Sequence, residues 1–422
     1  MSLFDQELDR RLAALREQGL GRSLRQVDSP QGTRIRANGR ELLNFSSNDY
    51  LGLANHPALK EAALRAVTHY GAGCGASRLI CGSLAPHHEL EEALAAFKGT
   101  EAALTFSSGY ATALGTIPAL VGKGDVVVID KLVHACIVDA ARLSGAKLRV
   151  FAHNDLNELD DILKWADRFQ SSRPEVRSPT LAIRNPHQGP RVLIVTESVF
   201  SMDGDLAPLR EIVELKDRYG AWLMVDEAHA TGLFGKTRRG LVDQFGLTHR
   251  VEVQMGTLGK ALGASGGYIA GSRVLVDDLV NRARSFIFST APVPAATAAA
   301  RAAVDLVQSD EGRRRCEQLR ARVAECRAGL TPDLWPLRQD AGPAESSPIL
   351  PLIIGDEAEA VRVAAALMDQ GVFIPAVRYP AVAHGSARLR LTLSAEHTAG
   401  DLTLLHQALA SVVPHSAFRV LQ

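Results

Sequence analysis

Two short segments of the sequence carry residues whose types and spacing could do chemistry together. The apolar run 221–225 ends in Asp226, and Lys260 lies in a stretch of small residues, 256–267. This combination suits pyridoxal phosphate, whose aldehyde binds a lysine as a Schiff base and whose ring nitrogen stays protonated beside a carboxylate. Crowding by small residues also favours loss of the lysine proton. The sequence therefore predicts a cofactor site built on Asp226 and Lys260.

Other interpretations of these residues exist. Singly, a strand-end aspartate is often a helix N-cap, and a lysine is usually a solvated surface group. The string Asp226-Glu-Ala-His229 is also typical of helicase-type ATPases, which need a phosphate loop, G-x-x-x-x-G-K-[ST], normally upstream of the acid. The nearest match, Gly235-Lys236-Thr237, follows the acid and has Ala230 in place of the first glycine. A nucleoside triphosphatase is the weaker interpretation, and a non-catalytic scaffold is a further alternative.

Length, charge and cysteine content limit the fold classes and binding partners that are possible for this protein. Its 422 residues suggest two or three domains. Lys plus Arg and Asp plus Glu both total 47, which leaves no overall basic field for a nucleic acid or an anionic membrane and favours small molecules. The first residues do not resemble a signal peptide, and no apolar run reaches membrane-spanning length. Five scattered cysteines argue against a disulfide framework or a metal site, so we expect a cytoplasmic protein.

Strand-like runs alternate with helical ones through the middle of the chain. Several runs are nearly continuous in Val, Ile and Leu, which predicts strands buried on both faces, as in a mostly parallel sheet flanked by helices. We expect seven strands in this α/β sheet, at 102–106, 126–130, 147–151, 192–196, 222–226, 251–255 and 267–270.

The sequence is expected to divide into three parts: an N-terminal arm with a helix (1–57), a large cofactor-binding domain (58–300) and a small C-terminal α+β domain (301–422). Residues 171–190, rich in Pro, Ser and Arg, predict a surface excursion without chemistry. The remaining expected elements are helices at 5–18 and from 295–307, and strands at 348–354, 371–375 and 387–393.

Further candidate residues follow the carboxyl ends of the strands, where ligands bind in such sheets. Gly109 and Tyr110 open a helix whose backbone N–H groups can bind a phosphate. His134 can stack its ring on a planar cofactor. Singly, each of these segments also fits an ordinary turn, cap or solvated loop. Three more side chains complete the set: Ser201 toward the phenolic oxygen of the cofactor ring, His229 one helical turn beyond Asp226, and Thr257 toward the phosphate.

With these residues the sequence resembles a known family, the alpha-oxoamine synthases, which are fold type I pyridoxal phosphate enzymes. The similarity spans about residues 44–393. It is carried by the strings Asn44-Phe-Ser-Ser-Asn-Asp-Tyr-Leu-Gly-Leu53, Gly71-Ala-Gly-Cys-Gly-Ala-Ser-Arg78, Glu197-Ser-Val-Phe-Ser-Met-Asp-Gly-Asp205, Asp226-Glu-Ala-His229, Thr257-Leu-Gly-Lys260 and Ala387-Arg-Leu-Arg-Leu-Thr392.

The resemblance implies a decarboxylative condensation of an amino acid with an acyl thioester. The strings 45–52 and 388–393 favour the members that join L-alanine to a pimeloyl thioester of coenzyme A or a carrier protein, in biotin synthesis. Members that use glycine or serine are the alternatives. Ala381 stands where a threonine is usual, and Cys74 where a serine is common, so the acyl donor stays open.

The resemblance also implies a role for each candidate residue. Catalysis falls to Lys260, His134 and Asp226. A homodimer with sites at the subunit interface is implied, because the segment of Ser289 and Thr290 reaches the cofactor phosphate of the neighbouring subunit. The other implied contacts are Gly109, Tyr110, Ser201, His229 and Thr257 to the cofactor, and Arg22, Asn48, Arg378 and His134 to the substrates.

Overall fold

A computed structural model describes residues 1–171, 190–330 and 347–412 of the chain. The expected excursion at 171–190 lies outside these residues, apart from its two ends. The described residues form two compact units, and the boundaries expected after 57 and 300 stay a prediction. The larger unit holds the described part of 56–201 and residues 206–313, and the smaller one holds 1–55, 202–205 and the described part of 314–422.

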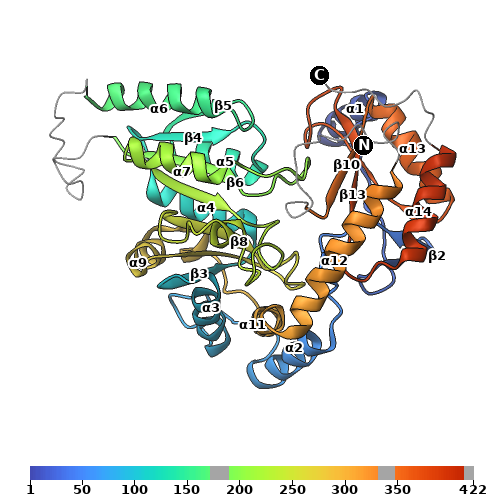
Figure 1. The fold of residues 1–422 in the computed structure, drawn as a ribbon, viewed down its shortest axis with the longest axis horizontal. Coiled ribbons are helices and arrows are strands. Elements are labelled where there is room, and N and C mark those ends of the chain that lie inside the picture. The colour runs from blue at the N-terminus through green and yellow to red at the C-terminus, as the bar shows by residue number, and fades with distance from the viewer. Residues whose placement is uncertain (172–189, 331–346, 413–422) are drawn as a thin grey trace. The chain divides into compact units, whose positions relative to one another are not determined.

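The larger unit contains one seven-stranded sheet of order β3-β9-β8-β7-β6-β4-β5 (Figure 1). Neighbouring strands are parallel, except that β9 is antiparallel to both β3 and β8. This confirms the expected fold class. The strands are β3 (Ala102–Phe106), β4 (Val126–Asp130), β5 (Lys147–Phe151), β6 (Val192–Glu197), β7 (Trp222–Asp226), β8 (Val253–Thr257) and β9 (Gly267–Gly271).

Burial explains why these runs form strands. All residues of β4 and β6 are buried, whereas the edge strand β5 exposes part of its length. Strands that are apolar on both faces need helices on both sides. The helices of this unit are α2 (Pro57–Tyr70), α3 (Ala85–Lys98), α4 (Gly109–Leu120), α5 (Ala135–Leu143), α6 (Leu156–Ser171), α7 (Leu209–Arg218), α8 (Leu241–Gln244), α9 (Arg273–Arg282), α10 (Arg284–Ile287) and α11 (Pro294–Gln308).

Most strands of the large sheet lie within one residue of their expected bounds, but β8 is shifted by two residues. The run 251–255 was expected to form a strand, but β8 begins at Val253 and ends at Thr257. The side chain of Glu252, rather than its backbone, accepts the N–H of Leu223 at the start of β7, at 2.8 Å. The strand therefore begins two residues later and carries Thr257 at its carboxyl end.

The smaller unit contains two three-stranded sheets, β1-β2-β11 and β10-β13-β12. The first includes a hairpin that the sequence analysis missed, whose turn residues Asn38 and Gly39 have positive φ of 51° and 74°. An Asn-Gly pair between two extended runs is a strong hairpin signal. The elements are α1 (Leu3–Glu17), β1 (Arg34–Ala37), β2 (Arg40–Asn44), α12 (Asp310–Gly329), which begins in the larger unit, β10 (Ile349–Gly355), α13 (Glu357–Asp369), β11 (Val372–Phe373), β12 (Ala376–Val377), β13 (Ala387–Thr392) and α14 (Ala399–Val412).

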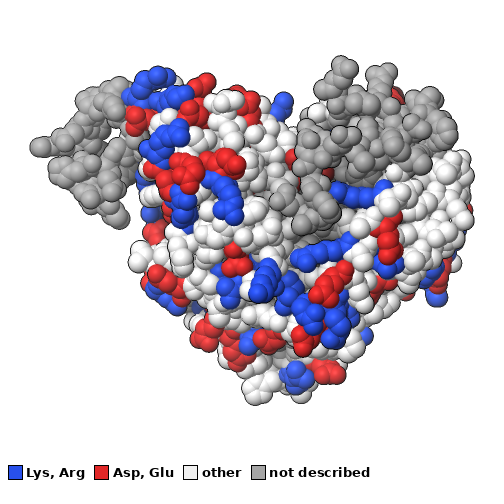
Figure 2. Space-filling model, viewed as in Figure 1, with Lys and Arg blue, Asp and Glu red and all other residues white. Residues whose placement is uncertain are grey.

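The described residues agree with the balanced charge of the sequence and with its lack of long apolar runs. On the face drawn in Figure 2, basic and acidic side chains are intermixed rather than gathered into one field of a single sign. No helix among the described residues has the length and apolar character needed to cross a membrane.

Candidate active site

Two neighbouring strands of the larger unit, β6 and β7, end in acidic side chains. Asp226 is the last residue of β7, and its partners in the sheet register are Glu197 in β6 and Met255 in β8. The Asp226 carboxyl is buried, and its Oδ1 accepts the N–H of Ala228 at 2.9 Å. Burial raises the pKa of Asp226, and the nearby Lys260 ammonium opposes that rise. A buried carboxyl stabilised by a nearby cation fits a protonated ring nitrogen.

Lys260 lies in the turn after β8 and points toward the same strand end. Its Nζ lies 2.7 Å from Nε2 of the buried His229, three residues beyond Asp226. An ammonium group only donates, so Nε2 of His229 accepts this hydrogen bond. The structure thus brings Asp226, His229 and Lys260 together.

Glu227, the second acid of the Asp-Glu-Ala-His string, is engaged elsewhere. Its side chain is fully buried, with Oε2 at 2.5 Å from Nζ of Lys98 and Oε1 accepting the N–H of Val242 at 2.9 Å. A carboxylate neutralised by a buried lysine is not available to a magnesium-bound nucleotide. This geometry argues against the nucleoside triphosphatase interpretation.

The amino end of α4 forms a cradle beside β8 and β9. A Cβ added to Gly267 would lie 2.8 Å from the backbone N of Gly109, and one added to Gly109 would lie 3.9 Å from Oγ1 of Thr257. The first N–H groups of a helix have no acceptor within the helix and favour anions. The Thr257 hydroxyl lies beside them, so the cradle fits a phosphate. Tyr110 is partly exposed, and its hydroxyl donates to Asp139 at 2.5 Å.

His134 is the residue before α5 and caps that helix with its ring, since Nδ1 accepts the N–H of Cys136 at 3.2 Å. Partial burial of the ring and the Lys260 charge lower its pKa, whereas Asp226 raises it. His134 and Asp226 therefore lie within electrostatic reach of one another. Ser201 is buried after β6, and the partly exposed Ser289–Thr290 segment bridges to Ser77.

The expected substrate-binding residues lie in the smaller unit. Arg22 donates to the carbonyl of Tyr379 at 2.8 Å, and Arg378 donates to the carbonyls of Gly19 and Gly21. Desolvation and the neighbouring Arg22 charge lower the pKa of Arg378, so the two cations lie close enough to repel each other. A carboxylate bound between them would relieve that repulsion.

Asn48 and a residue that the sequence analysis missed form a second contact in this unit. Asn48 Oδ1 accepts hydrogen bonds from Arg390 at 3.0 Å and from the Tyr50 hydroxyl at 3.1 Å. Arg390 is buried in β13. An arginine in a run that otherwise reads as a buried strand was the available signal, because buried arginines are usually paired.

Glu197 is the other residue that the sequence analysis missed, although it lies inside a quoted string. Its side chain is buried at the end of β6, and Oε1 accepts the backbone N–H of His134 at 2.5 Å. Burial and the Asp226 charge raise its pKa to about 8. An acid at the end of a run that begins with four apolar residues, 192–195, was the signal.

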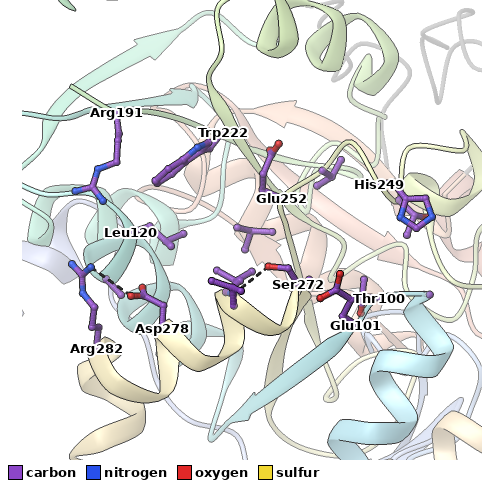
Figure 3. Close-up of a pocket in the computed structure, with 18 residues that line it drawn as sticks. Thr100, Glu101, Leu120, Arg191, Trp222, His249, Glu252, Ser272, Asp278 and Arg282 are labelled. Carbon is purple, nitrogen blue, oxygen red and sulfur yellow. Dashed lines mark hydrogen bonds and ion pairs between the residues drawn. The ribbon is translucent and has the colours of Figure 1, made fainter. Parts of the chain in front are cut away.

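A pocket of about 710 Å³ lies at the opposite end of the sheet (Figure 3). Trp222 at the start of β7 and Arg191 before β6 line it, together with Leu120 at the end of α4. The Asp226 and Lys260 site lies at the carboxyl ends of the same strands. None of the expected site residues lines this pocket, so it is separate from the candidate active site.

Comparisons with known proteins give matches over most of the chain. The model of the family "Aminotransferase class I and II" matches residues 40–409. The chain is 48% identical to the 8-amino-7-oxononanoate synthase of Geobacter sulfurreducens, over 95% of this chain and 96% of that protein. It is 44% identical to the enzyme of the same name from Herminiimonas arsenicoxydans, over 96% of this chain and 99% of that protein.

Two solved structures extend the comparison. A serine palmitoyltransferase from S. paucimobilis with a bound PLP-myriocin aldimine has a TM-score of 0.85 and 27% identity, with 98% of both chains covered. An 8-amino-7-oxononanoate synthase from Francisella tularensis has a TM-score of 0.70 and 25% identity, with 88% of this chain and 97% of that chain covered.

Proposed function

We infer that this chain, which belongs to the aminotransferase class I and II family and to its alpha-oxoamine synthase branch, is a pyridoxal-phosphate-dependent acyltransferase. It condenses L-alanine with a pimeloyl thioester to give 8-amino-7-oxononanoate, a step of biotin synthesis. The observation that carries this function is the convergence of Asp226 and the Lys260–His229 contact at one strand end. Near-full-length identity of 48% to an enzyme of that name supports the choice of substrates.

Each part of the cofactor can be assigned to residues near the strand ends. We propose that the amides of Gly109 and Tyr110, with the Thr257 hydroxyl, hold the phosphate, and that Asp226 faces the ring nitrogen. The remaining contacts proposed are His134 against the ring face, and Ser201 and His229 toward the phenolic oxygen. Pyridoxal phosphate, when bound, withdraws electrons from the α-carbon of the amino acid.

Proton transfer at the α-carbon is proposed for Lys260. Its Nζ lies 2.7 Å from Nε2 of His229, which can hold or return a proton at that atom. Burial of Asp226 disfavours a lone negative charge there, so the carboxyl is stabilised only with a cation beside it. In the folded chain the Lys260 charge is the nearby cation, and we propose that a protonated ring nitrogen takes that place when the cofactor is bound.

The smaller unit is proposed to select the substrates. Arg22 and Arg378 carry neighbouring positive charges, which suits a carboxylate of alanine or of the acyl chain. Asn48 is proposed to contact substrate with the support of Arg390. A homodimer, with Ser289 and Thr290 reaching the partner's phosphate, and a cytoplasmic location complete the proposal.

A substrate panel tests this function. The purified chain, loaded with pyridoxal phosphate, is given alanine, glycine or serine with pimeloyl, acetyl or palmitoyl thioesters, and thiol release is measured. Alanine with the pimeloyl thioester should give the highest kcat/KM, and Lys260→Ala should abolish thiol release. A higher kcat/KM for glycine with the acetyl thioester, or for serine with the palmitoyl thioester, would assign the chain to another member of the branch.

A further inference from the structure

The hydrogen bonds around His134 determine which ring nitrogen carries a proton. Nδ1 lies 3.2 Å from the backbone N of Cys136 and 3.0 Å from its Sγ. A backbone N–H group can only donate, so Nδ1 must be an acceptor. A neutral ring in this position therefore has its proton on Nε2.

The charged groups near His134 keep the ring neutral on balance. Partial burial lowers its pKa first, and the Lys260 ammonium lowers it further. Asp226 and Asp139 act in the opposite direction without reversing the shift. Glu197 touches the backbone of His134 rather than its ring.

Glu197 ties the loop that bears His134 to two other strand ends. Oε1 accepts the His134 N–H at 2.5 Å, and the carboxyl also accepts the backbone N–H of Ser201. In the sheet register Glu197 is paired with Asp226. One buried carboxyl thus joins the segments after β4 and β6 at the point where β7 ends.

We propose that Glu197 is a positioning residue, which fixes the amino end of α5 through the His134 backbone and thereby orients His134 as the neutral tautomer protonated at Nε2. Such a ring donates a hydrogen bond from Nε2 to a substrate oxygen and does not act as a base. Lys260 is then the group that removes the α-proton. The inference rests on the proposed function only in that His134 faces the cofactor and substrates.

The protonation of Glu197 predicts which substitutions are tolerated. Burial and the Asp226 charge raise its pKa to about 8, so at neutral pH the side chain is largely uncharged. Glutamine has the same shape as a protonated glutamate and keeps an acceptor oxygen. Glu197→Gln should therefore support His134, whereas Glu197→Ala should not.

The test uses the full-length holoenzyme with ¹⁵N-labelled histidine, and the His134 signals are assigned with His134→Asn. Nitrogen NMR reports which ring nitrogen is protonated, and steady-state kinetics give kcat and KM for each variant. The matched control is Asp125→Ala. Asp125 is also buried and accepts two backbone N–H groups, from Gly122 and Arg191, at the other end of the sheet.

We expect wild type and Glu197→Gln to show a proton on Nε2 of His134 and none on Nδ1. Glu197→Ala should shift or broaden these signals and lower kcat by up to about 100-fold, as misplacement by about 1 Å can do, with a smaller change in KM. Asp125→Ala should leave the His134 signals unchanged.

Two results would overturn the proposal. One is a proton on Nδ1 in the wild-type holoenzyme. The other is a loss of kcat together with altered His134 signals in Glu197→Gln, as expected for a misplaced ring. This second result can be measured even if Glu197→Ala does not fold. The NMR readout needs no acyl substrate, so an error in the choice of amino acid or thioester would leave it intact and would appear only in the substrate panel.

Discussion

Replacing Lys98 with methionine should destabilise the larger unit strongly. Lys98 and Glu227 have no exposed side-chain surface, and Nζ of Lys98 lies 2.5 Å both from Oε2 of Glu227 and from the carbonyl of Arg239. Burial alone would lower the pKa of Lys98, but Glu227 raises it, so the pair is charged in the folded chain. Methionine preserves most of the volume and removes only the cation.

The size of the stability loss depends on the contacts that the Glu227 carboxylate retains. After Lys98→Met its carboxylate retains the N–H of Val242 as a donor, at 2.9 Å, but has no cation. Removing one partner of a buried pair costs about 3–5 kcal/mol, because the remaining charge is left uncompensated. Glu227→Gln in the same chain removes that charge, so the double variant should recover part of the loss.

Urea-dependent hydrogen exchange of peptides from α3 and β7 measures this loss in the larger unit itself. The free energy of opening should fall by about 3–5 kcal/mol in Lys98→Met and by less in the double variant. A loss below about 1 kcal/mol, as for a solvent-exposed pair, or a double variant no more stable than Lys98→Met, would refute the reasoning.

Three further predictions concern the site and its supports. Asp226→Asn should keep the fold and lower kcat by at least about 100-fold, the order found for loss of one electrostatic partner of a reacting group; unchanged turnover of thiol release would contradict it. Gly267→Ala should weaken the affinity for pyridoxal phosphate, measured by absorbance titration, because the new Cβ would lie 2.8 Å from the backbone N of Gly109. Gly122→Ala is the control and should leave the affinity unchanged, because its Cβ would lie 3.8 Å from its nearest neighbour, the Ser144 carbonyl oxygen. Between pH 4.5 and about 8 the folded chain holds a proton on Glu197 that the unfolded chain releases. The free energy of unfolding should therefore fall as pH rises, by up to about 1.4 kcal/mol per pH unit. Glu197→Gln should make this fall less steep, and an unaltered pH slope would count against the raised pKa.

The strands could be predicted from the sequence because their composition leaves little choice. Runs such as 126–129 and 192–195 are apolar on both faces, and only a covered sheet buries them. The boundary of β8 could not be read in this way. It depends on the Glu252 side chain, which bonds a residue of β7 that is distant in sequence.

The candidate site shows the same division. Asp226 and Lys260 were recognisable because each stands beside a distinctive local pattern. Glu197 and Arg390 act through contacts with His134 and Asn48, which only the folded chain brings near them. The polar residue types of Glu197 and Arg390 inside apolar runs were a signal of function, but the partner of each is visible only in the folded chain.

The proposed cofactor site can be tested directly by identifying the residue that binds pyridoxal phosphate. The chain is incubated with pyridoxal phosphate, reduced with borohydride, digested and mapped by mass spectrometry, with Lys260→Ala as the control. We expect a pyridoxyl group on Lys260 and none in the control. Stoichiometric attachment to a different lysine, or none at saturating cofactor, would contradict it.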